Sequence, residues 1–338
     1  MDQPVAATPR LRPMSLGDMF DAAFRLYRQH FLTFIGITAL LYVPVAILQL
    51  GLQLGYGSGA LENWMRFATR PPTLLPGQSI FDVMPLGEIL TFIGLSMGLG
   101  VLQFLLVQNL ITGALANAVA RSYTGQPVSI LDAYRLGWRR FLSLIGASLA
   151  TLAIGMVALT VIFGCTFGLA FVLLGSATGS RSSSAGVLAG VAVALAMLGL
   201  LLLLGLASLF FYTRLIVTTQ AIVLEDRGPL SGLGRSWRLI SGSFWRTLAI
   251  AVLMYILAYI IAGIPSALVS FVLQLLSANS LGAIMRNQAI VTLVATLGQI
   301  VILPLQLVIF TLLYYDLRVR KEGYDLELIA QSQQVTAP

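Results

Sequence analysis

Side chains that could support catalysis or metal binding are few in this chain. His30 is the only histidine and Cys165 the only cysteine among 338 residues, which excludes a metal site with two histidine ligands and an intrachain disulfide bond. Glu225 and Asp226 form an acidic pair, which we interpret as a turn between helices, because no further acids cluster around it. The sequence contains no P-loop, no dinucleotide-binding glycine motif and no nucleophile elbow. We therefore expect no enzymatic activity, no cofactor and no bound metal.

Amide side chains within long apolar runs are a second group with chemical potential. The candidates for polar contacts inside a membrane are Gln103, Asn109, Asn117, Gln299 and Gln306. Such amides line cavities or hydrogen-bond between helices, and the second role is the more common. A transport path would require a polar-lined cavity that joins amides of the first half to Gln299 or Gln306.

Arginine follows an aromatic residue at three well-separated places. The pattern aromatic-Arg-Leu-x4-Phe occurs at residues 24–31, 134–141 and 237–244. A guanidinium group pairs bidentately with phosphate, so arginines in and beside these segments are candidate contacts for anionic lipid headgroups. They are Arg25, Arg28, Arg135, Arg139, Arg140, Arg235 and Arg238. The alternative, which we favour, is that they fix the topology and lie at the membrane surface without a specific ligand.

The composition places these groups in a polytopic membrane protein. The chain is 58% hydrophobic and 10% charged, whereas a soluble domain carries about 25% charged residues. Six runs exceed the roughly 20 apolar residues that a spanning helix needs. We predict an all-α fold with six transmembrane helices, at approximately 31–54, 87–119, 141–174, 185–213, 245–276 and 289–315. Beyond their first two residues these runs contain no Asp, Glu, Lys, Arg or His, which argues against an ion-coupled pump but not against a lipid-handling path.

A short amphipathic helix is predicted before the first, third and fifth runs. Ser15 and Asp18 form a capping box, Ser129 and Asp132 form a second, and Pro229 suits the first position of the third helix. The first helix carries an apolar stripe, which we expect to lie in the lipid at the interface. Its residues are Leu16, Met19, Phe20, Ala23, Phe24, Tyr27 and Phe31. We interpret the whole as a threefold internal repeat, which is common in transport proteins and also arises by plain duplication.

The domain limits and the orientation follow from the same pattern. We predict a flexible N-terminal tail at 1–14, a single membrane domain at 15–322 and a C-terminal tail at 323–338. Of the 20 Lys and Arg residues, four (Arg66, Arg70, Arg181 and Arg286) lie in the connections on one side, and the other sixteen lie on the side of the termini. The positive-inside rule therefore predicts that both termini are cytoplasmic.

Pairs of glycines four residues apart occur in several of the runs. They are Gly51/Gly55, Gly94/Gly98, Gly164/Gly168 and Gly186/Gly190. This spacing lets helices approach closely, either within the chain or between two copies. We expect packing within the chain.

Three stretches resemble a known bacterial family. They are LRPMSLGD and AFRLYR at 11–28, AIVLE to RSWRL at 221–239, and LYYDLRVRKEGYDLE at 313–327. They are similar to the membrane-domain family of glycerophosphoryl diester phosphodiesterase. In that enzyme, hydrolysis resides in a separate soluble barrel domain with paired histidines and metal-binding acids, so the resemblance implies the membrane module alone.

We therefore expect a non-enzymatic membrane module of the bacterial cytoplasmic (inner) membrane that supports a lipid- or glycerophosphodiester-related partner. The alternative is a transporter or channel-like path for a small or lipidic substrate; an intramembrane lipid enzyme is the third and weakest hypothesis. The expected partners are membrane lipids, with anionic headgroups on the cytoplasmic side, and either a second copy of the chain or a membrane partner protein. The net charge of +7 surrounds apolar runs, so we expect no nucleic acid.

Overall fold

The computed structural model describes residues 13–75, 77–123, 125–178, 183–276 and 281–323. The structure is 89% helical, and its described residues form no strand. The helices, with three π-helical segments marked η, are α1 (Leu16–Gln29), α2 (Phe31–Gly51), η1 (Leu52–Gly57), α3 (Ser58–Thr69), α4 (Ile80–Val83), α5 (Leu86–Leu102), η2 (Gln103–Val107), α6 (Gln108–Tyr123), α7 (Ile130–Arg139), α8 (Phe141–Thr178), α9 (Ser183–Leu215), α10 (Thr218–Leu224), α11 (Pro229–Ile240), α12 (Phe244–Ala258), η3 (Tyr259–Gly263), α13 (Ile264–Leu276) and α14 (Leu281–Glu322).

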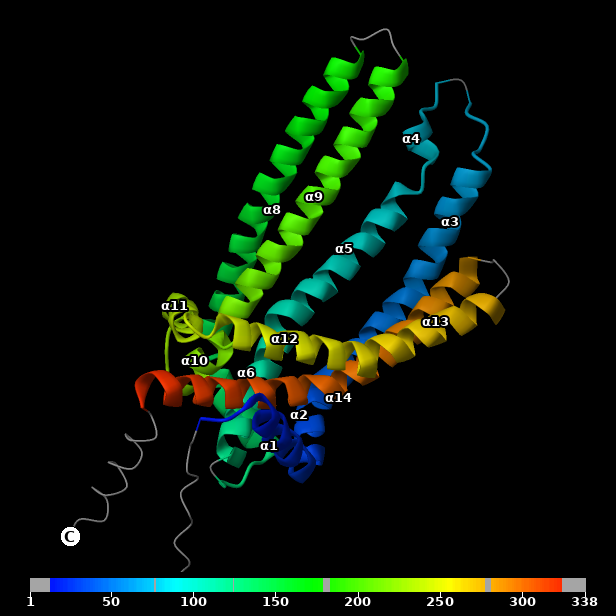
Figure 1. The fold of residues 1–338 in the computed structure, drawn as a ribbon. Coiled ribbons are helices and arrows are strands. Elements are labelled where there is room, and N and C mark those ends of the chain that lie inside the picture. The colour runs from blue at the N-terminus through cyan, green and yellow to red at the C-terminus, as the bar shows by residue number, and fades with distance from the viewer. Residues whose placement is uncertain (1–12, 76, 124, 179–182, 277–280, 324–338) are drawn as a thin grey trace, which may run out of the picture.

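Six helical stretches of the described chain are long and apolar enough to cross a membrane. They are Phe31–Thr69, Leu86–Tyr123, Phe141–Val161, Gly190–Leu224, Phe244–Leu276 and Arg286–Glu322. Each overlaps one of the six predicted runs, although the bounds differ, so the prediction of an all-α fold with six helices able to span a membrane is confirmed. In Figure 1 three helical hairpins, α2–α6, α8–α9 and α12–α14, fan out from a shared base.

The short helices α1, α7 and α11 lie where the aromatic-Arg-Leu-x4-Phe pattern predicts them. Phe31, Phe141 and Phe244 are the first residues of α2, α8 and α12. Ser15 and Asp18 form the predicted capping box of α1. At α7, Ser129 accepts from the amide of Asp132, and its hydroxyl donates to the Asp132 carboxylate.

Each of the three short helices packs against other helices of the chain. Helix α1 lies on α14, α7 on α6 and α2, and α11 on α8, α9 and α10. In each short helix a side-chain hydroxyl hydrogen-bonds to a main-chain carbonyl of another helix. Tyr27 donates to the carbonyl of Val301 at 2.8 Å and Tyr134 to that of Ile37 at 2.5 Å. In α11, Ser236 donates to the carbonyl of Arg214 at 2.9 Å. The short helices are therefore part of the packed base of the molecule.

The expectation that the apolar stripe of α1 lies in lipid is wrong for part of the stripe. Met19, Ala23 and Tyr27 were expected in lipid, but they are buried in the protein core with Leu26, on the face that packs against α14. Leu16, Phe24 and Phe31 do remain exposed. Contact with α14 removes apolar surface from water just as lipid would, so periodicity alone does not distinguish the two.

Glycine allows the closest contacts within the base. A Cβ atom added at Gly36 would lie 2.7 Å from Cδ1 of Ile130, the first residue of α7. One added at Gly146 would lie 2.7 Å from Cγ of Pro229, the first residue of α11. Gly36 and Gly146 stand at the same distance in sequence from Phe31 and Phe141, so the start of the next short helix packs onto the same position of α2 and α8.

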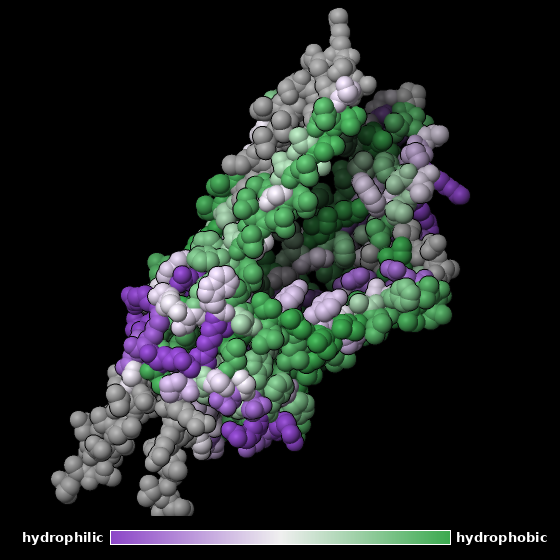
Figure 2. Space-filling model, viewed as in Figure 1, coloured by the Kyte–Doolittle hydropathy of each residue, from purple (hydrophilic) through white to green (hydrophobic). Residues whose placement is uncertain are grey.

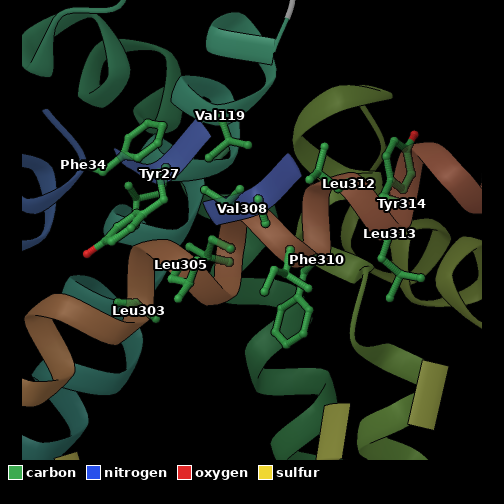
Figure 3. Packing of buried hydrophobic residues seen from close by; sticks show 14 of the residues in the cluster. Tyr27, Phe34, Val119, Leu303, Leu305, Val308, Phe310, Leu312, Leu313 and Tyr314 are labelled. Atoms are coloured by element: carbon green, nitrogen blue, oxygen red, sulfur yellow. The ribbon is translucent and has the colours of Figure 1, made fainter. Parts of the chain in front are cut away.

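Helix α14 forms the centre of the buried core. Figure 3 shows Leu303, Leu305 and Val308 of α14 beside Tyr27 of α1 and Phe34 of α2. The cluster extends along α14 to Leu312, Leu313 and Tyr314 and also includes Val119 of α6. The shared core therefore lies at the end of the molecule where the short helices meet.

The ends of the hairpins away from the base have a different surface. Val187, Leu188 and Phe171 are between 67% and 80% exposed, and Figure 2 shows largely hydrophobic surface along the hairpins. The expectation that the glycine pairs pack within the chain is wrong for Gly51/Gly55, Gly94/Gly98 and Gly164/Gly168, because a Cβ atom added at any of these six would meet no described atom within 4 Å. The same is true of Gly190, and the side-chain position of Gly186 lies outside the described residues.

The predicted tails fall almost wholly outside the described residues, which leave out 1–12 and 324–338. Met14, the last residue of the predicted N-terminal tail, lies among the described residues. The amide of Met14 donates to Asp316 at 2.8 Å, and its carbonyl accepts from Arg246 and Arg320. These contacts join Met14 to the membrane domain.

Candidate functional site

A cavity of about 590 Å³ lies between α6, η2, α8, α9, α10 and α14, beside the packed base. Most of its lining is aliphatic or aromatic. The polar lining includes Asn109, Ser148, Thr151, Thr218, Thr219 and Gln306. Figure 2 shows a hollow beside the α8–α9 hairpin, with hydrophobic surface along the hairpin and more polar residues along the opposite rim.

The segment η2 positions Asn109 in the wall of this cavity. Where π-helical bonding returns to α-helical bonding, one main-chain carbonyl is left without its usual amide partner. The side-chain amide of Asn109 donates to the carbonyls of Phe104 at 3.2 Å and Leu105 at 3.0 Å. Its oxygen accepts from the hydroxyl of Ser148 in α8 at 2.8 Å. Asn109 therefore stabilises the local helix geometry and joins two walls of the cavity.

Helix α10 contributes a polar side chain without a partner. The chain turns after Leu215, and Thr218 begins α10 at the cavity. Thr218 is 8% exposed, and its buried Oγ1 forms no hydrogen bond with any described residue. An unpartnered buried hydroxyl costs about 1–3 kcal/mol. A ligand group that hydrogen-bonds to Thr218 would remove that cost.

The structure separates the five amides that the sequence singled out. Asn109 and Gln306 line the same cavity, from α6 and α14. Gln103 accepts from Gln49 at 2.6 Å, and Asn117 donates to the carbonyl of Gly113 within its own helix. These two have the interhelical and local roles that are usual for membrane amides. Gln299 lies on α14 and is not among the residues that line the cavity.

The seven candidate headgroup arginines also divide. Arg25, Arg28, Arg135, Arg139 and Arg238 are exposed, and within the described part of the chain they form no ion pair. Arg140 pairs with Asp226, and Arg235 pairs with Glu225 and Glu322. Arg140 and Arg235 are therefore engaged by carboxylates of the protein, whereas the other five are exposed at the protein surface.

The pair Glu225–Asp226 forms the predicted turn, but Glu225 is also the centre of an ionic network that sequence reasoning missed. Its carboxylate accepts from Arg227 at 2.6 Å, from Arg235 at 2.9 and 3.0 Å, and from Tyr314 at 2.5 Å. Burial alone would raise the pKa of Glu225, but the hydrogen bonds from Arg235, Tyr314 and Arg227 outweigh it and hold the pKa below its usual value. The partners stand far apart in sequence, so no local pattern could have revealed the network.

A second network surrounds Asp316, whose side chain is fully buried. It pairs with Arg246 at 2.7 Å and with Arg320 at 3.0 Å, and it accepts from the amide of Met14. These contacts tie the start of α1, the start of α12 and the end of α14 together. In the sequence, the segment LYYDLRVRK was singled out only by its resemblance to a known family, and that resemblance gave Asp316 no role.

The cavity lining suits binding more than bond-making chemistry. Its residues provide hydroxyl and amide groups but no carboxylate, imidazole or amine. Among the described residues, no cluster of three His, Cys, Asp or Glu side chains could hold a metal ion. The arrangement can therefore enclose a hydrocarbon chain and hydrogen-bond a neutral polar group.

Comparison with known proteins gives one match. A family model described as a domain of unknown function (DUF7847) matches residues 30–317, which include every residue that lines the cavity. No curated protein and no solved structure matches the chain.

Proposed function

The chain belongs to the family described as a domain of unknown function (DUF7847), and on this premise we propose that it is a non-enzymatic membrane module that holds a lipid in its intramembrane cavity. The observation that carries the proposal is the cavity between α6, α8, α9 and α14. Its volume of about 590 Å³ lies within the range of roughly 300–1,000 Å³ that is typical of ligand sites. A mostly apolar wall with a few convergent hydroxyl and amide groups favours an amphiphile.

We propose that the module lies in the bacterial cytoplasmic membrane with both termini in the cytoplasm. The positive-inside count supports this, as does the position of α1, α10 and α11 at the end of the molecule from which the hairpins fan out (Figure 1). The short helices α1, α7 and α11 would then lie at the cytoplasmic interface, and their exposed arginines would face anionic headgroups. Five such arginines are Arg25, Arg28, Arg135, Arg139 and Arg238.

A threefold repeat is part of the same proposal. Three times a short helix ends, and a phenylalanine begins a long helix within a few residues. The matching contacts at Gly36 and Gly146 support a common ancestry of the first two units. Such repeats often enclose a ligand site between their units, and the cavity here is bounded by helices of all three.

The resemblance to the membrane domain of glycerophosphoryl diester phosphodiesterase supports a role beside a partner. We propose that the module presents or retains a lipid for a protein that acts on lipids or glycerophosphodiesters, as a membrane partner protein or within a homo-oligomer. The chain itself supplies the binding site and no catalytic group.

One observation favours a second function, a path for a lipidic substrate. Asn109 and Gln306 come from the two halves of the chain and line one cavity, as a transport path requires. Retention and transport can be separated in liposomes that contain the protein and a fluorescent phospholipid. Movement of the lipid between leaflets at a rate that depends on Gln306 would favour transport, whereas a rate equal to that of protein-free liposomes favours retention.

Native mass spectrometry of protein extracted in mild detergent tests lipid binding directly. Ala207 lines the cavity, and its neighbour Leu206 is 64% exposed and lies outside the lining. We expect the wild type and Leu206→Trp to carry the same bound lipid, and Ala207→Trp to lose at least four fifths of it because the indole fills the space. Equal lipid in both variants, or none in the wild type, would contradict the proposal.

A further inference from the structure

We infer that Arg214, at the end of α9, binds the phosphate of an anionic lipid headgroup whose hydrocarbon chain occupies the cavity. The inference rests on the proposed lipid site and adds the class of its ligand. Arg214 is absent from the aromatic-Arg-Leu-x4-Phe pattern, and the cavity lining does not include it. Its environment differs from that of the exposed arginines.

Three aromatic rings fix the guanidinium group of Arg214. Its central carbon lies 5.3 Å from the ring centroid of Phe210, 5.0 Å from that of Trp237 and 5.6 Å from that of Phe244. These rings come from three elements, α9, α11 and α12. Cation–π contacts hold a guanidinium in place without using its N–H groups as an ion pair would. The group is therefore positioned in advance and still able to donate hydrogen bonds.

The hydrogen-bonding capacity of Arg214 is unused within the described part of the chain. Its Nε and Nη1 atoms are buried without an acceptor. Glu225 pairs with Arg227 and Arg235, and Glu322 pairs with Arg235 and Arg318, so these carboxylates are engaged by other arginines. Buried donors of a charged group are costly to leave unpaired, and an anion would satisfy them.

A second cation and a helix start strengthen the positive potential at this place. Lys321 lies within electrostatic range of Arg214, and its amine donates to the carbonyls of Arg238 and Ser241. Phe244 begins α12, and Ser243 provides no side-chain cap for the first amides of that helix. The unpaired guanidinium, the ammonium group and the positive end of α12 all favour an anion.

The aromatic wall also connects Arg214 to the cavity. Phe211 lines the cavity, and its ring centroid lies 6.0 Å from that of Trp237, which stands against the Arg214 guanidinium. Leu215, which follows Arg214, lines the cavity too. A charged headgroup at Arg214 and a hydrocarbon chain in the cavity are thus separated by the width of one aromatic layer. This is the arrangement that an amphiphile requires.

Lipid selectivity tests the inference. Protein expressed in one host is extracted and incubated with mixed micelles of phosphatidylglycerol and phosphatidylethanolamine, and the bound lipids are counted by native mass spectrometry. We expect the wild type to prefer phosphatidylglycerol, and Arg214→Gln to reduce the bound ratio of the two lipids at least fivefold while total occupancy is kept. The matched control Arg70→Gln removes an exposed arginine at the end of α3, far from the proposed headgroup arginines in sequence, and should change the ratio less than twofold.

The outcomes separate the two proposals. Loss of selectivity in Arg214→Gln with lipid still bound supports the inference, and equal ratios in Arg214→Gln and Arg70→Gln would overturn it even if Ala207→Trp empties the cavity. A wild type without bound lipid would overturn the proposed function itself. Should Arg214→Gln fail to fold, Arg214→Lys replaces it, with an expected intermediate ratio because an ammonium cannot pair bidentately.

Inorganic phosphate distinguishes a lipid headgroup from a free phosphate. Added at millimolar concentration, it should leave bound phosphatidylglycerol unchanged, because the hydrocarbon chain contributes most of the binding energy. Displacement of the lipid by inorganic phosphate would assign Arg214 to a soluble anion and overturn the lipid assignment.

Discussion

The base and the arms of this molecule are both rich in apolar residues, but they differ in how much of that apolar sequence is buried in protein. The base consists of α1, α7, α10 and α11 with the parts of α2, α6 and α14 that pack against them; the arms are α3–α5, α13 and the ends of α8 and α9 away from the base. Half of the most apolar part of Arg286–Glu322 is buried in protein. In Gly190–Leu224, none of the most apolar part is buried. The base is therefore held by protein contacts, whereas the arms expose apolar surface that lipid would cover in a membrane.

The difference teaches where function can be sought. In the base, paired charges, glycine contacts and a shared core hold the helices in one closely packed arrangement. In the arms, hydrophobic composition is sufficient, because lipid adapts to any apolar surface. The cavity lies at the border of the two regions, where the packed base meets helices with exposed apolar surface. That border is a suitable place to bind a lipid selectively.

The largest effect on this comparison should come from Asp316. Its fully buried carboxylate joins Met14, Arg246 and Arg320, so Asp316→Ala removes the carboxylate that pairs with two cations. We expect a loss of about 3–5 kcal/mol in the free energy of unfolding. In the arms, Arg66→Ala breaks an exposed pair with Glu62 and should cost no more than about 1 kcal/mol. Thermal unfolding in mild detergent measures both, and equal losses would contradict the division into base and arms.

A smaller effect should follow from Glu225 and should depend on pH. Because its pKa is lowered in the folded protein, the ion pairs of Glu225 contribute stability above the ordinary value of 4.5, and this contribution is lost as the pH falls through the lowered pKa. Glu225→Gln should cost about 1.5–3 kcal/mol at pH 7. The gap between the two proteins should narrow below about pH 4.5. Unfolding titrations at pH 7 and in the acid range check this; a gap that widens in acid would contradict the sign.

The glycines offer the mildest and most local comparison. A Cβ atom at Gly137 in the base would lie 2.7 Å from the amide nitrogen of Ala114, whereas one at Gly94 in the arms would meet no described atom within 4 Å. We expect Gly137→Ala to cost about 1–3 kcal/mol by overpacking. Gly94→Ala should leave stability unchanged or slightly raised, since alanine favours helix. Similar melting temperatures for the two variants would show that α6 and α7 are not tightly packed.

The helical framework could be predicted from the sequence because it depends on local properties. Runs of apolar residues gave the six membrane helices, and Ser15, Ser129 and Pro229 marked where the short helices begin. The sequence predicts the apolar face of α1 but not what that face contacts, since Met19 and Ala23 are apolar whether they face lipid or α14. The glycine pairs misled for the same reason, because spacing shows that helices can approach but not that they do.

Only some residues of the candidate site could be identified from the sequence. Asn109 and Gln306 were identified because amides are rare in apolar runs, but their presence in one cavity depends on how α6 and α14 pack. The contacts of Glu225 and Asp316 join residues far apart in sequence. Arg214 resembled any arginine at the end of a membrane helix, and only the three rings around it set it apart.

A density map of the protein in lipid nanodiscs, determined by electron cryo-microscopy, would test the central claim most directly. We expect an elongated density between α8, α9 and α14, in contact with Thr218 and Gln306, whose charged end lies at Arg214. A map in which α8 and α9 close onto α14, so that side chains fill the space and no lipid density remains, would contradict it.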